Sequence, residues 1–309
     1  MKDALILREG DKVSLVATAR KVTPEEVSPA ICLLESWGLR VVIPDALYAA
    51  ENQFAGSDSH RATFFQRQLD DPEIRAIFCV RGGYGTVRMV DLLDFTTFKR
   101  NPKWIVGYSD VTVLHSHIHC NCGVPTLHGT MPINITMEDV LHNPVSLASL
   151  YDILFHGVMQ CSVELPRGAT VKNRPGRCQA EVVGGNLSVL YSLIGSSSDI
   201  DTAGKILLIE DLDEYLYHID RMMMALKRAG KFRGLKGLIV GAMSEMHDNT
   251  VPFGRNAEQI VRDAVAEYDF PVAYYCPFGH IGNQNHSLPL GLVVEFEVSE
   301  NKAIVSVVM

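Results

Sequence analysis

Short apolar runs alternate with amphipathic segments along the first half of the chain, a pattern typical of strands buried between helices. The apolar runs are expected to form strands at residues 13–18, 39–44, 76–80 and 104–107. Helices are expected at residues 24–38, 59–71 and 86–95, and from Asp110 onward. Thr23 suits the N-cap of the first helix and Gly38 its C-terminal stop. This β-α-β-α order predicts a doubly wound parallel sheet.

The second half of the chain is richer in strand-like segments. Strands are expected at residues 206–209, 237–243, 272–275, 292–298 and 303–308, the last two as an antiparallel hairpin because little chain separates them. Helices are expected at residues 143–157, 187–194, 219–230 and 257–268. Residues 161–177, with Pro166 and Gly168, form either a linker or the first strands of a second domain. We therefore predict an N-terminal doubly wound α/β domain (1–160) followed by a smaller, β-rich α/β domain (161–309).

Composition narrows the class of protein. The 309 residues are 47% hydrophobic and 21% charged, which excludes a disordered chain, and the net charge of −8 argues against nucleic acid or an anionic membrane as partner. No apolar run approaches the roughly 18 residues of a membrane span, and the first residues lack the apolar core of a signal peptide. The seven cysteines are an odd number, and Cys32 and Cys79 are expected to be buried free thiols. Together these features predict a cytoplasmic protein.

The segment Gly107-Tyr108-Ser109-Asp110 joins a predicted strand to a predicted helix. A tight turn of this kind can push a serine Oγ out at the carboxyl edge of a sheet, as in a nucleophile elbow. The N-terminus of the following helix directs N–H groups to the same place, where they could stabilise an oxyanion. Position 111 is Val, so the full G-x-S-x-G pattern is absent. Taken alone, the tetrapeptide is better explained as a helix cap.

The loop Arg81-Gly82-Gly83-Tyr84-Gly85 follows the preceding predicted strand, so it lies at the same sheet edge as Ser109. Glycines at this edge let the backbone approach a ligand closely. The loop lacks the Gly-Lys-Ser/Thr of a phosphate-binding loop and the spacing of a dinucleotide fingerprint. A glycine turn without any ligand is the simpler interpretation of these residues alone.

Two residues in the second half suit acid–base chemistry. Glu210 ends a predicted strand and could orient a histidine, although the acids that follow it also fit a surface turn. His280 follows Gly279 in a loop and could act as a general base, because histidine titrates nearest to neutral pH. A loop histidine with a structural hydrogen bond is the alternative.

The segment from His115 to Cys122 contains three histidines and two cysteines. His115 and His119 are four residues apart and would share one helix face. Position 116 is Ser, so the H-E-x-x-H motif is absent, and no second cysteine pair follows at zinc-site spacing. We therefore expect this helix to pack against the sheet and to bind no metal.

Taken together, these segments resemble the LD-carboxypeptidase family of serine peptidases, peptidase family S66. The match runs in the family's order from about residue 13 nearly to the end of the chain. Its blocks are Val80-Arg81-Gly82-Gly83-Tyr84-Gly85, Gly107-Tyr108-Ser109-Asp110, Gly184-Gly185-Asn186-Leu187-Ser188, Ile209-Glu210-Asp211 with Ile219-Asp220-Arg221-Met222, and Phe278-Gly279-His280 with Leu288-Pro289-Leu290-Gly291.

The resemblance implies roles for individual residues. Ser109 would be the nucleophile, His280 the general base and Glu210 the group that orients it. The backbone N–H groups of Gly83 and Asp110 would form the oxyanion hole, and neither metal nor cofactor is implied. The implied activity is removal of the terminal D-Ala from a muropeptide tetrapeptide at an L-to-D bond, by a homodimer. The implied triad is split between the two predicted domains.

The chain departs from the family's pattern at two places. Family members commonly carry Pro-Ser after the first strand, where this chain has Ala17-Thr18-Ala19-Arg20, and commonly a Pro where this chain has Tyr215. Glu214 competes with Glu210 for the role beside the histidine, and the strand-end position favours Glu210. Arg81 and Arg221 are candidates to bind the substrate. Because the substrate is anionic, the site is expected to be less acidic than the whole chain.

Three alternatives stay open at this point. The first is a peptidase of the same family that hydrolyses a peptide-nucleotide antibiotic, as in microcin C self-immunity, although the compact length favours the muropeptide enzyme. The second is a non-catalytic α/β ligand-binding module. The third is a metallohydrolase that uses the His115–Cys122 segment.

Overall fold

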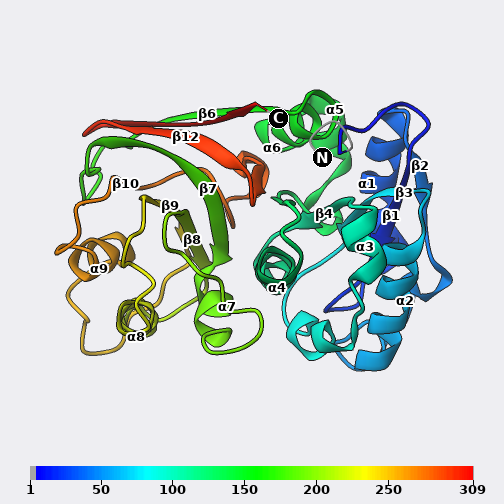
Figure 1. Cartoon of the computed structure of the whole chain (residues 1–309), viewed down its shortest axis with the longest axis horizontal. Helices are drawn as coiled ribbons and strands as arrows, with labels where there is room; N and C mark the ends of the chain where they lie inside the picture. Colours follow the sequence, from blue (N-terminus) through cyan, green and yellow to red (C-terminus); the bar gives the residue numbers. More distant parts are fainter. Residues whose placement is uncertain (1–4, 309) are drawn as a thin grey trace.

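The structure, a computed structural model, describes residues 5–308 and contains two β-sheets with helices packed on them (Figure 1). The N-terminal stretch on which the signal-peptide expectation partly depends, residues 1–4, lies outside the described residues. The strands of the first sheet are β1 (Lys12–Val16), β2 (Arg40–Val42), β3 (Ile74–Cys79), β4 (Trp104–Gly107), β5 (Thr126–His128) and β11 (Leu288–Leu290). The helices of this half are α1 (Pro24–Ser36), α2 (Asp58–Asp70), α3 (Thr96–Arg100), α4 (Thr112–Cys122), α5 (Met137–His142) and α6 (Val145–Tyr151).

The first sheet has the order β11-β5-β4-β3-β1-β2, and its first five strands along the chain pair in parallel. Alternate residues of a strand point to opposite faces. Leu15, Phe78 and Val106 accordingly join the cluster that includes α1 and α6, whereas Ile77 and Ile105 join the one that includes α2, α3 and α4. Helices therefore cover both faces, and the predicted doubly wound parallel sheet is confirmed.

The second sheet is mixed, with the order β10-β9-β8-β7-β12-β13-β6. Its strands are β6 (Val158–Glu164), β7 (Gly176–Asn186), β8 (Ile206–Leu212), β9 (Gly237–Ser244), β10 (Val272–Ala273), β12 (Val293–Val298) and β13 (Lys302–Val308). The helices α7 (Leu187–Ser192), α8 (Leu216–Arg228) and α9 (Ala257–Ala264) pack on one of its faces. β12 and β13 pair antiparallel, as the predicted hairpin requires.

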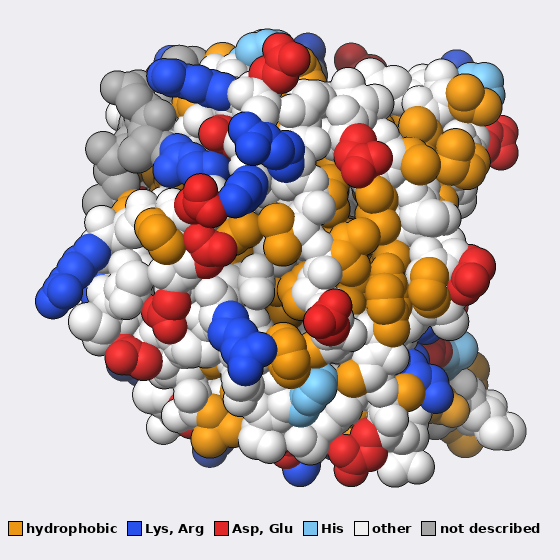
Figure 2. Space-filling model, turned by 90° about the vertical axis from the view of Figure 1, so that its right-hand side faces the viewer, with side chains coloured by type: hydrophobic (Ala, Val, Ile, Leu, Met, Phe, Trp, Pro, Cys, Tyr) orange, Lys and Arg blue, Asp and Glu red, His pale blue; other side chains and the backbone are white. Residues whose placement is uncertain are grey.

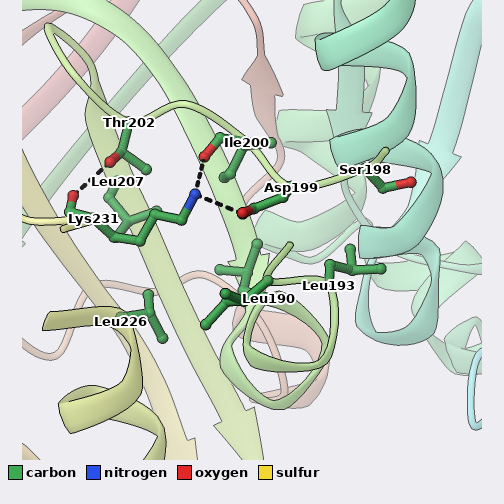
Figure 3. A pocket seen from close by; sticks show the side chains of 10 residues that line it. Leu190, Leu193, Ser198, Asp199, Ile200, Thr202, Leu207, Leu226 and Lys231 are labelled. Carbon is green, nitrogen blue, oxygen red and sulfur yellow. Dashed lines mark hydrogen bonds and ion pairs between the residues drawn. The ribbon is translucent and has the colours of Figure 1, made fainter. Parts of the chain in front are cut away.

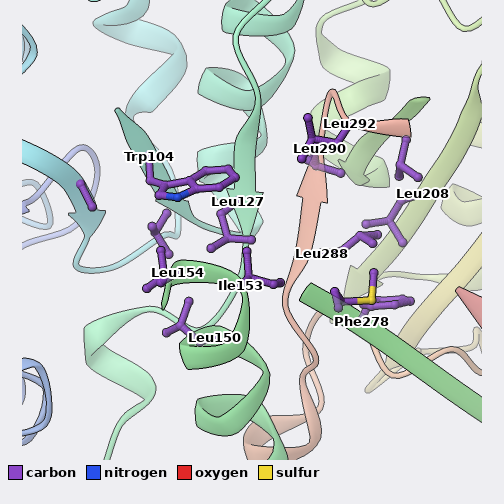
Figure 4. Close-up of a cluster of buried hydrophobic side chains, with 14 of the residues drawn as sticks. Trp104, Leu127, Leu150, Ile153, Leu154, Leu208, Phe278, Leu288, Leu290 and Leu292 are labelled. Carbon is purple, nitrogen blue, oxygen red and sulfur yellow. The ribbon is translucent and has the colours of Figure 1, made fainter. Parts of the chain in front are cut away.

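The other face of the second sheet turns toward the first sheet. Leu208 of β8 and Phe278 belong to the same buried cluster as Trp104 of β4 and Leu127 of β5 (Figure 4). β11 lies between these groups, because it returns from the second half of the chain to pair antiparallel with β5. The two halves thus share one core, and the division of the chain near residue 160 stays a prediction about domain boundaries.

The expectation of a helix over residues 86–95 is wrong. This stretch forms two short 3-10 turns, Thr86–Arg88 and Val90–Leu92. The Gln66 side chain binds both the N–H and the C=O of Asp94, at 2.8 Å each, and so removes that backbone from any helical ladder. The Asp94 side chain then accepts from the Thr96 N–H at the start of α3, which the sequence analysis did not predict.

Other expected elements differ in length. The helix expected over residues 143–157 is divided into α6 and a π-helical turn over Asp152–His156, and α5 precedes it unpredicted. Residues 161–177 contain the end of β6 and the start of β7, joined by a loop over 165–175, so the stretch includes both a connection and strands of the second sheet. Cys79 is buried as expected, but Cys32 is exposed on α1.

The face formed by the flank of α1, α2 and β2 mixes charges of both signs and carries a group of hydrophobic side chains near its middle (Figure 2). Lys and Arg form no continuous stripe on this face. In the part of the chain from residue 5 to 308, no helix combines the length and the apolar character that a membrane crossing demands.

Candidate active site

The turn after β4 places Ser109 in a strained backbone conformation. Ser109 has φ 63°, in the left-handed region that a residue with a Cβ adopts only at a cost of about 1–3 kcal/mol. A 3-10 turn over Ser109–Val111 leads directly into α4. Gly107 permits this tight turn, because a Cβ at that position would lie 2.8 Å from a methyl group of Val111. Strain of this kind is commonly retained where it positions a reacting group.

The glycine loop after β3 packs directly against this turn. A Cβ at Gly82 would lie 3.1 Å from Ser109 Oγ, so glycine at this position lets the loop approach the serine closely. The Asp110 carboxylate accepts a hydrogen bond from the Thr86 N–H at 2.9 Å and ties the end of the loop to the elbow. Burial raises the pKa of Asp110, and its hydrogen bonds from Thr86 oppose that rise. The two segments that the sequence placed at one sheet edge therefore touch.

Arg61 of α2 is a buried support that the sequence analysis missed. Its side chain is 1% exposed and donates to the carbonyls of Thr18, Gly56 and Gly85 at 3.0, 2.7 and 3.4 Å, while Asp58 balances its charge at 2.5 Å. It thus joins the loops that follow β1 and β3. The sequence did contain a signal for this role, because an arginine stands at a position of α2 where the helical pattern places buried side chains.

Glu210 and His280 meet in the second half. Glu210 lies in β8, is fully buried, and its Oε2 accepts from His280 Nδ1 at 2.6 Å. Gly279 and Gly241 make room for this carboxylate, since a Cβ at these positions would lie 2.4 Å from Glu210 Oε2 and 3.0 Å from Glu210 Cβ. The bond at Nδ1 leaves His280 Nε2 as the nitrogen available to a substrate or a nucleophile.

The loop that carries His280 is held by its own hydrogen bonds. The Asn285 side chain accepts from the Gly279 N–H at 2.8 Å, and the Ser244 hydroxyl donates to the His280 carbonyl at 2.7 Å. The chain then continues into β11 on the edge of the first sheet. His280 is therefore fixed between the two sheets.

Two opposing effects act on the pKa of His280. Burial lowers it, but the hydrogen bond and the charge of Glu210, with smaller contributions from Asp211 and Glu245, raise the pKa above its ordinary value on balance. The Tyr108 ring stands edge-on to the imidazole, with centroids 4.8 Å apart. The pair resembles the base and orienting carboxylate of a catalytic triad.

The competing acid and the candidate arginines have other partners. Glu214 binds His218 Nδ1 at 2.6 Å, so Glu210 alone of these two glutamates binds His280. Arg81 lies 3.4 Å from Glu26, and the Arg221 guanidinium lies over the Tyr217 ring at 5.1 Å.

The two halves are joined beside the elbow. A Cβ at Gly185 would lie 2.5 Å from Thr112 Oγ1, and that hydroxyl accepts from the Asn186 N–H at 3.0 Å. Asp211 accepts from the Asn186 side chain and from the Ser188 N–H. Burial, followed by the charge of Glu210, raises the pKa of Asp211 to about 7. The Gly-Gly-Asn block therefore brings the end of β7 onto the first turn of α4.

Ser109 and His280 line the same cavity, which has a volume of about 490 Å³. The elbow, the glycine loop, α7 and the segment after Glu210 form its walls. Its carboxylates belong to Asp110, Asp211, Asp213 and Glu214. Among the residues described, Arg20 is the one arginine or lysine that lines it. We expected the site to be less acidic than the whole chain. Judged by the types of residue that line the cavity, that expectation is wrong.

The segment from His115 to Cys122 is structural in its contacts. His115 is buried and bonds Thr126 Oγ1 at 2.8 Å and the Gly107 carbonyl at 2.9 Å, so both of its ring nitrogens are occupied. Burial lowers the pKa of His115 to about 4. Within residues 5–308, no three histidine, cysteine or acidic side chains form a group that could hold a metal ion.

A second, much smaller cavity beside α7 has a volume of only about 10 Å³, room for about one water. Lys231 crosses it and bonds Asp199 at 2.5 Å and the Ile200 carbonyl at 2.7 Å, while Thr202 donates to the Lys231 carbonyl (Figure 3). These bonds tie the chain before β8 to the end of α8. The cavity is too small for a substrate.

Comparison with known proteins connects this site to a family. The profile described as the LD-carboxypeptidase N-terminal domain matches residues 13–129, and that of the LD-carboxypeptidase C-terminal domain matches residues 179–296. The chain is 34% identical to the probable murein peptide carboxypeptidase of Bacillus subtilis, over 97% of this chain and 92% of the relative. It is 27% identical to the murein tetrapeptide carboxypeptidase of Pseudomonas aeruginosa, over 93% of each chain.

Solved structures share the fold. The muramoyltetrapeptide carboxypeptidase from Oxalobacter formigenes superposes with a TM-score of 0.84 at 22% identity, covering 96% of this chain and 99% of the other. The microcin C7 self immunity protein superposes with a TM-score of 0.83 at 21% identity, covering 97% of each. At these identities the likeness concerns architecture alone.

Proposed function

The chain belongs to the LD-carboxypeptidase family of serine peptidases, peptidase family S66, and from this premise we propose that Ser109, His280 and Glu210 are its catalytic triad. The contact that carries the proposal is the 2.6 Å bond between buried Glu210 and His280, in a cavity that Ser109 also lines. The substrate is the tetrapeptide of a muropeptide, and the products are the tripeptide and free D-Ala.

Each group has one task in the reaction. His280 Nε2 takes the proton from Ser109 Oγ as the oxygen attacks the carbonyl carbon of the scissile L-to-D peptide bond. The resulting imidazolium is stabilised by Glu210, which accepts from Nδ1–H. His280 then gives its proton to the departing amine of D-Ala. Water attacks the acyl-enzyme with His280 again as base, and Ser109 is released.

The oxyanion of each tetrahedral intermediate is bound by the backbone N–H groups of Gly83 and Asp110. Asp110 lies in the first turn after the elbow, where N–H groups lack intrahelical partners. The loop that carries Gly83 packs on Ser109 through Gly82. Loss of one such donor costs about 10²–10³-fold in kcat.

The test is release of D-Ala from L-Ala-γ-D-Glu-L-Lys-D-Ala and from its diaminopimelate counterpart, with Ser109→Ala as the paired variant. We expect the wild type to release D-Ala and Ser109→Ala to lose at least about 10⁴-fold in kcat. A serine-directed phosphonate should label the wild type and not the variant. Hydrolysis that persists in Ser109→Ala would disprove the assignment of the nucleophile.

The same assay separates the alternatives. Hydrolysis of an aspartyl or glutamyl sulfamoyl nucleoside without release of D-Ala would indicate an immunity-type peptidase. Failure of the phosphonate to label Ser109, together with tight binding of the peptide, would indicate a ligand-binding module.

Further expectations belong to the proposal. The enzyme uses neither metal nor cofactor, acts in the cytoplasm, and binds neither nucleic acid nor membrane. The homodimer that the resemblance implies can be measured by light scattering of the purified protein. These expectations are independent of the triad, so each of them can be wrong while the assignment of the triad is right.

A further inference from the structure

Arg20 is held firmly at the mouth of the cavity. It follows β1, and its backbone forms an isolated β-bridge with Phe54. On either side, the Lys21 N–H donates to the Gln53 carbonyl and the Ala55 N–H to the Ala19 carbonyl, both at 3.0 Å. The side chain is exposed and lines the cavity together with Ser109 and His280. The backbone at Arg20 is thus held by hydrogen bonds, while its long side chain is exposed.

Two consecutive glycines separate Arg20 from the proposed nucleophile. A Cβ at Gly82 would lie 3.1 Å from Ser109 Oγ, and a Cβ at Gly83 would lie 2.7 Å from Arg20 Cδ and Nε. Gly83 has φ 106°, which a residue with a side chain would avoid. Adjacent residues of the loop therefore contact Ser109 and Arg20, and both side chains line the same cavity.

Arg20 differs from the acidic side chains that line the cavity, because it has no bonded partner among the described residues. Each of the four carboxylates has a partner within the chain. They pair as Asp110 with the Thr86 N–H, Asp211 with Asn186, Asp213 with His247 and Glu214 with His218. Across residues 5–308, the Arg20 guanidinium has no hydrogen bond or ion pair. Arg20 is consequently the one cationic side chain of the described lining that is free to bind an anionic group, although acids outnumber cations.

A carboxypeptidase must bind a carboxylate close to its nucleophile. In a peptide, the carbon of the terminal carboxylate is three bonds from the scissile carbonyl carbon, which is less than about 4 Å. A group that binds it must therefore lie beside Ser109. Arginine presents two parallel N–H donors that match the two oxygens of a carboxylate.

We propose that Arg20 binds the free α-carboxylate of the substrate's terminal residue and thereby restricts the enzyme to the chain end. The inference rests on the proposed function, because it assigns the recognition step of that same reaction. It places the specificity of this chain at a position where it departs from the family's Pro-Ser pattern. Arg81 and Arg221, the candidates from the sequence, do not line the cavity.

The experiment compares the tetrapeptide with its C-terminal amide, using wild type, Arg20→Gln, Arg20→Lys and Arg221→Gln. The wild type should prefer the acid by roughly 10- to 100-fold in kcat/KM, the range expected for a charged hydrogen bond. Arg20→Gln should lose this preference by a rise in KM for the acid alone, and Arg20→Lys should retain part of it. Arg221→Gln, an exposed arginine outside the cavity, should behave like the wild type.

A binding measurement separates this inference from the proposed function. In the Ser109→Ala background, calorimetry should show tighter binding of the acid than of the amide, and Arg20→Gln should abolish the difference. A wild type that fails to hydrolyse the tetrapeptide but shows this binding difference refutes the proposed function alone. If Arg20→Gln keeps the preference for the acid, or weakens acid and amide equally, Arg20 does not bind the terminal carboxylate.

Discussion

Two histidine-bearing regions contact the same elbow, His115 at the Gly107 carbonyl and His280 at the Tyr108 ring, and differ in what surrounds them. His280 is mostly buried and pairs with the carboxylate of Glu210 at 2.6 Å. His115 is buried as well, but its partners are the neutral Thr126 hydroxyl and the Gly107 carbonyl. The pKa of His280 is raised, whereas that of His115 is lowered to about 4. Burial acts alike on both, so the presence of a carboxylate partner decides the sign.

The comparison teaches how a reactive histidine differs from a structural one. His280 keeps one nitrogen bonded to an acid and presents the other to a cavity. His115 uses both nitrogens inside the fold and in doing so supports the Gly107 carbonyl, at the start of the elbow. The His115 segment has more histidines, but the partners of each ring identify His280 as the one suited to act as a base.

The largest expected effect is at His280. His280→Ala should lower kcat by about 10⁴-fold or more, because the proposed nucleophile loses its base. The Tm should also fall, because His280→Ala leaves the buried Glu210 carboxylate without its partner, so kcat is referred to the folded fraction. Steady-state release of D-Ala and thermal unfolding measure the two quantities. Retained activity in a folded His280→Ala protein would remove the distinction between the two histidines.

The next effect is at Glu210. Glu210→Gln should lower kcat by up to about 10⁴-fold, because the amide can no longer stabilise the imidazolium. It should also change the pH profile. The base must be neutral, so kcat/KM of the wild type should rise with pH through a midpoint above the ordinary histidine value of about 6.5. Without the carboxylate, burial dominates and the midpoint should move below that of the wild type.

An unchanged acid limb in Glu210→Gln would show that another group titrates. Glu214→Gln is the matched control, since Glu214 contacts His218 and not His280. It should leave the midpoint in place, whatever it does to KM.

Sequence alone could predict the parts of the site that are local. The strand-to-helix turn at Ser109, the glycine loop and the strand end at Glu210 are each contiguous, and the resemblance put them in order. The buried position of Arg61 left a local signal, but its partners could not be predicted, because it joins carbonyls up to 43 positions away. The close contact between Arg20 and Gly83 could not be predicted either, because it depends on how two loops approach each other.

The fold shows the same division between local and distant signals. The buried parallel strands of the first sheet were predictable from apolar runs. β5 and β11 have three residues each, too few for a periodic pattern, and β11 is placed by its distant partner β5. β7 was missed because its first half alternates polar residues and its second half ends in glycines. The Thr86–Phe95 stretch has a helical pattern, but Gln66 holds its end in another conformation.

At His115 the expected effect is on stability. His115→Ala should lower the free energy of unfolding by about 2–4 kcal/mol, because it leaves a cavity and two buried polar partners without a bond. The kcat/KM of the folded fraction should change by less than about tenfold, a far smaller loss than His280→Ala causes. Urea unfolding and active-site titration measure these separately. A loss of activity comparable to His280→Ala, with unchanged stability, would reverse the two roles.

The two histidines should also give stability opposite dependences on pH. His115 has a lowered pKa, so its contribution is present above about pH 6.5 and is lost as the pH falls from there toward about 4. His280 has a raised pKa, so its contribution is present below about pH 6.5 and is lost as the pH rises through its own pKa. Substituting His115 by Leu should therefore reduce the gain in unfolding free energy between pH 5 and pH 8, on the order of 1–2 kcal/mol.

His280→Gln should enlarge the same gain, because it removes a contribution that favours low pH. Urea titrations of the wild type and both variants at the two pH values provide the six unfolding free energies needed. Changes of the same sign in both variants would mean that the two environments do not differ in the way their partners indicate.

The smallest expected effect is that of a chelator. A metal at the His115 segment would need free ring nitrogens, but both nitrogens of His115 are bonded within the fold, and the pKa of the nearby Cys122 thiol is raised by burial, which disfavours the thiolate that metals bind. Prolonged dialysis against EDTA should therefore leave kcat/KM within about twofold and the Tm unchanged, and added Zn²⁺ should not raise either. Activity that EDTA removes and Zn²⁺ restores would make the His115 segment the reactive one. Because Ser109→Ala would then lose little activity, the two assays together decide which histidine carries the chemistry.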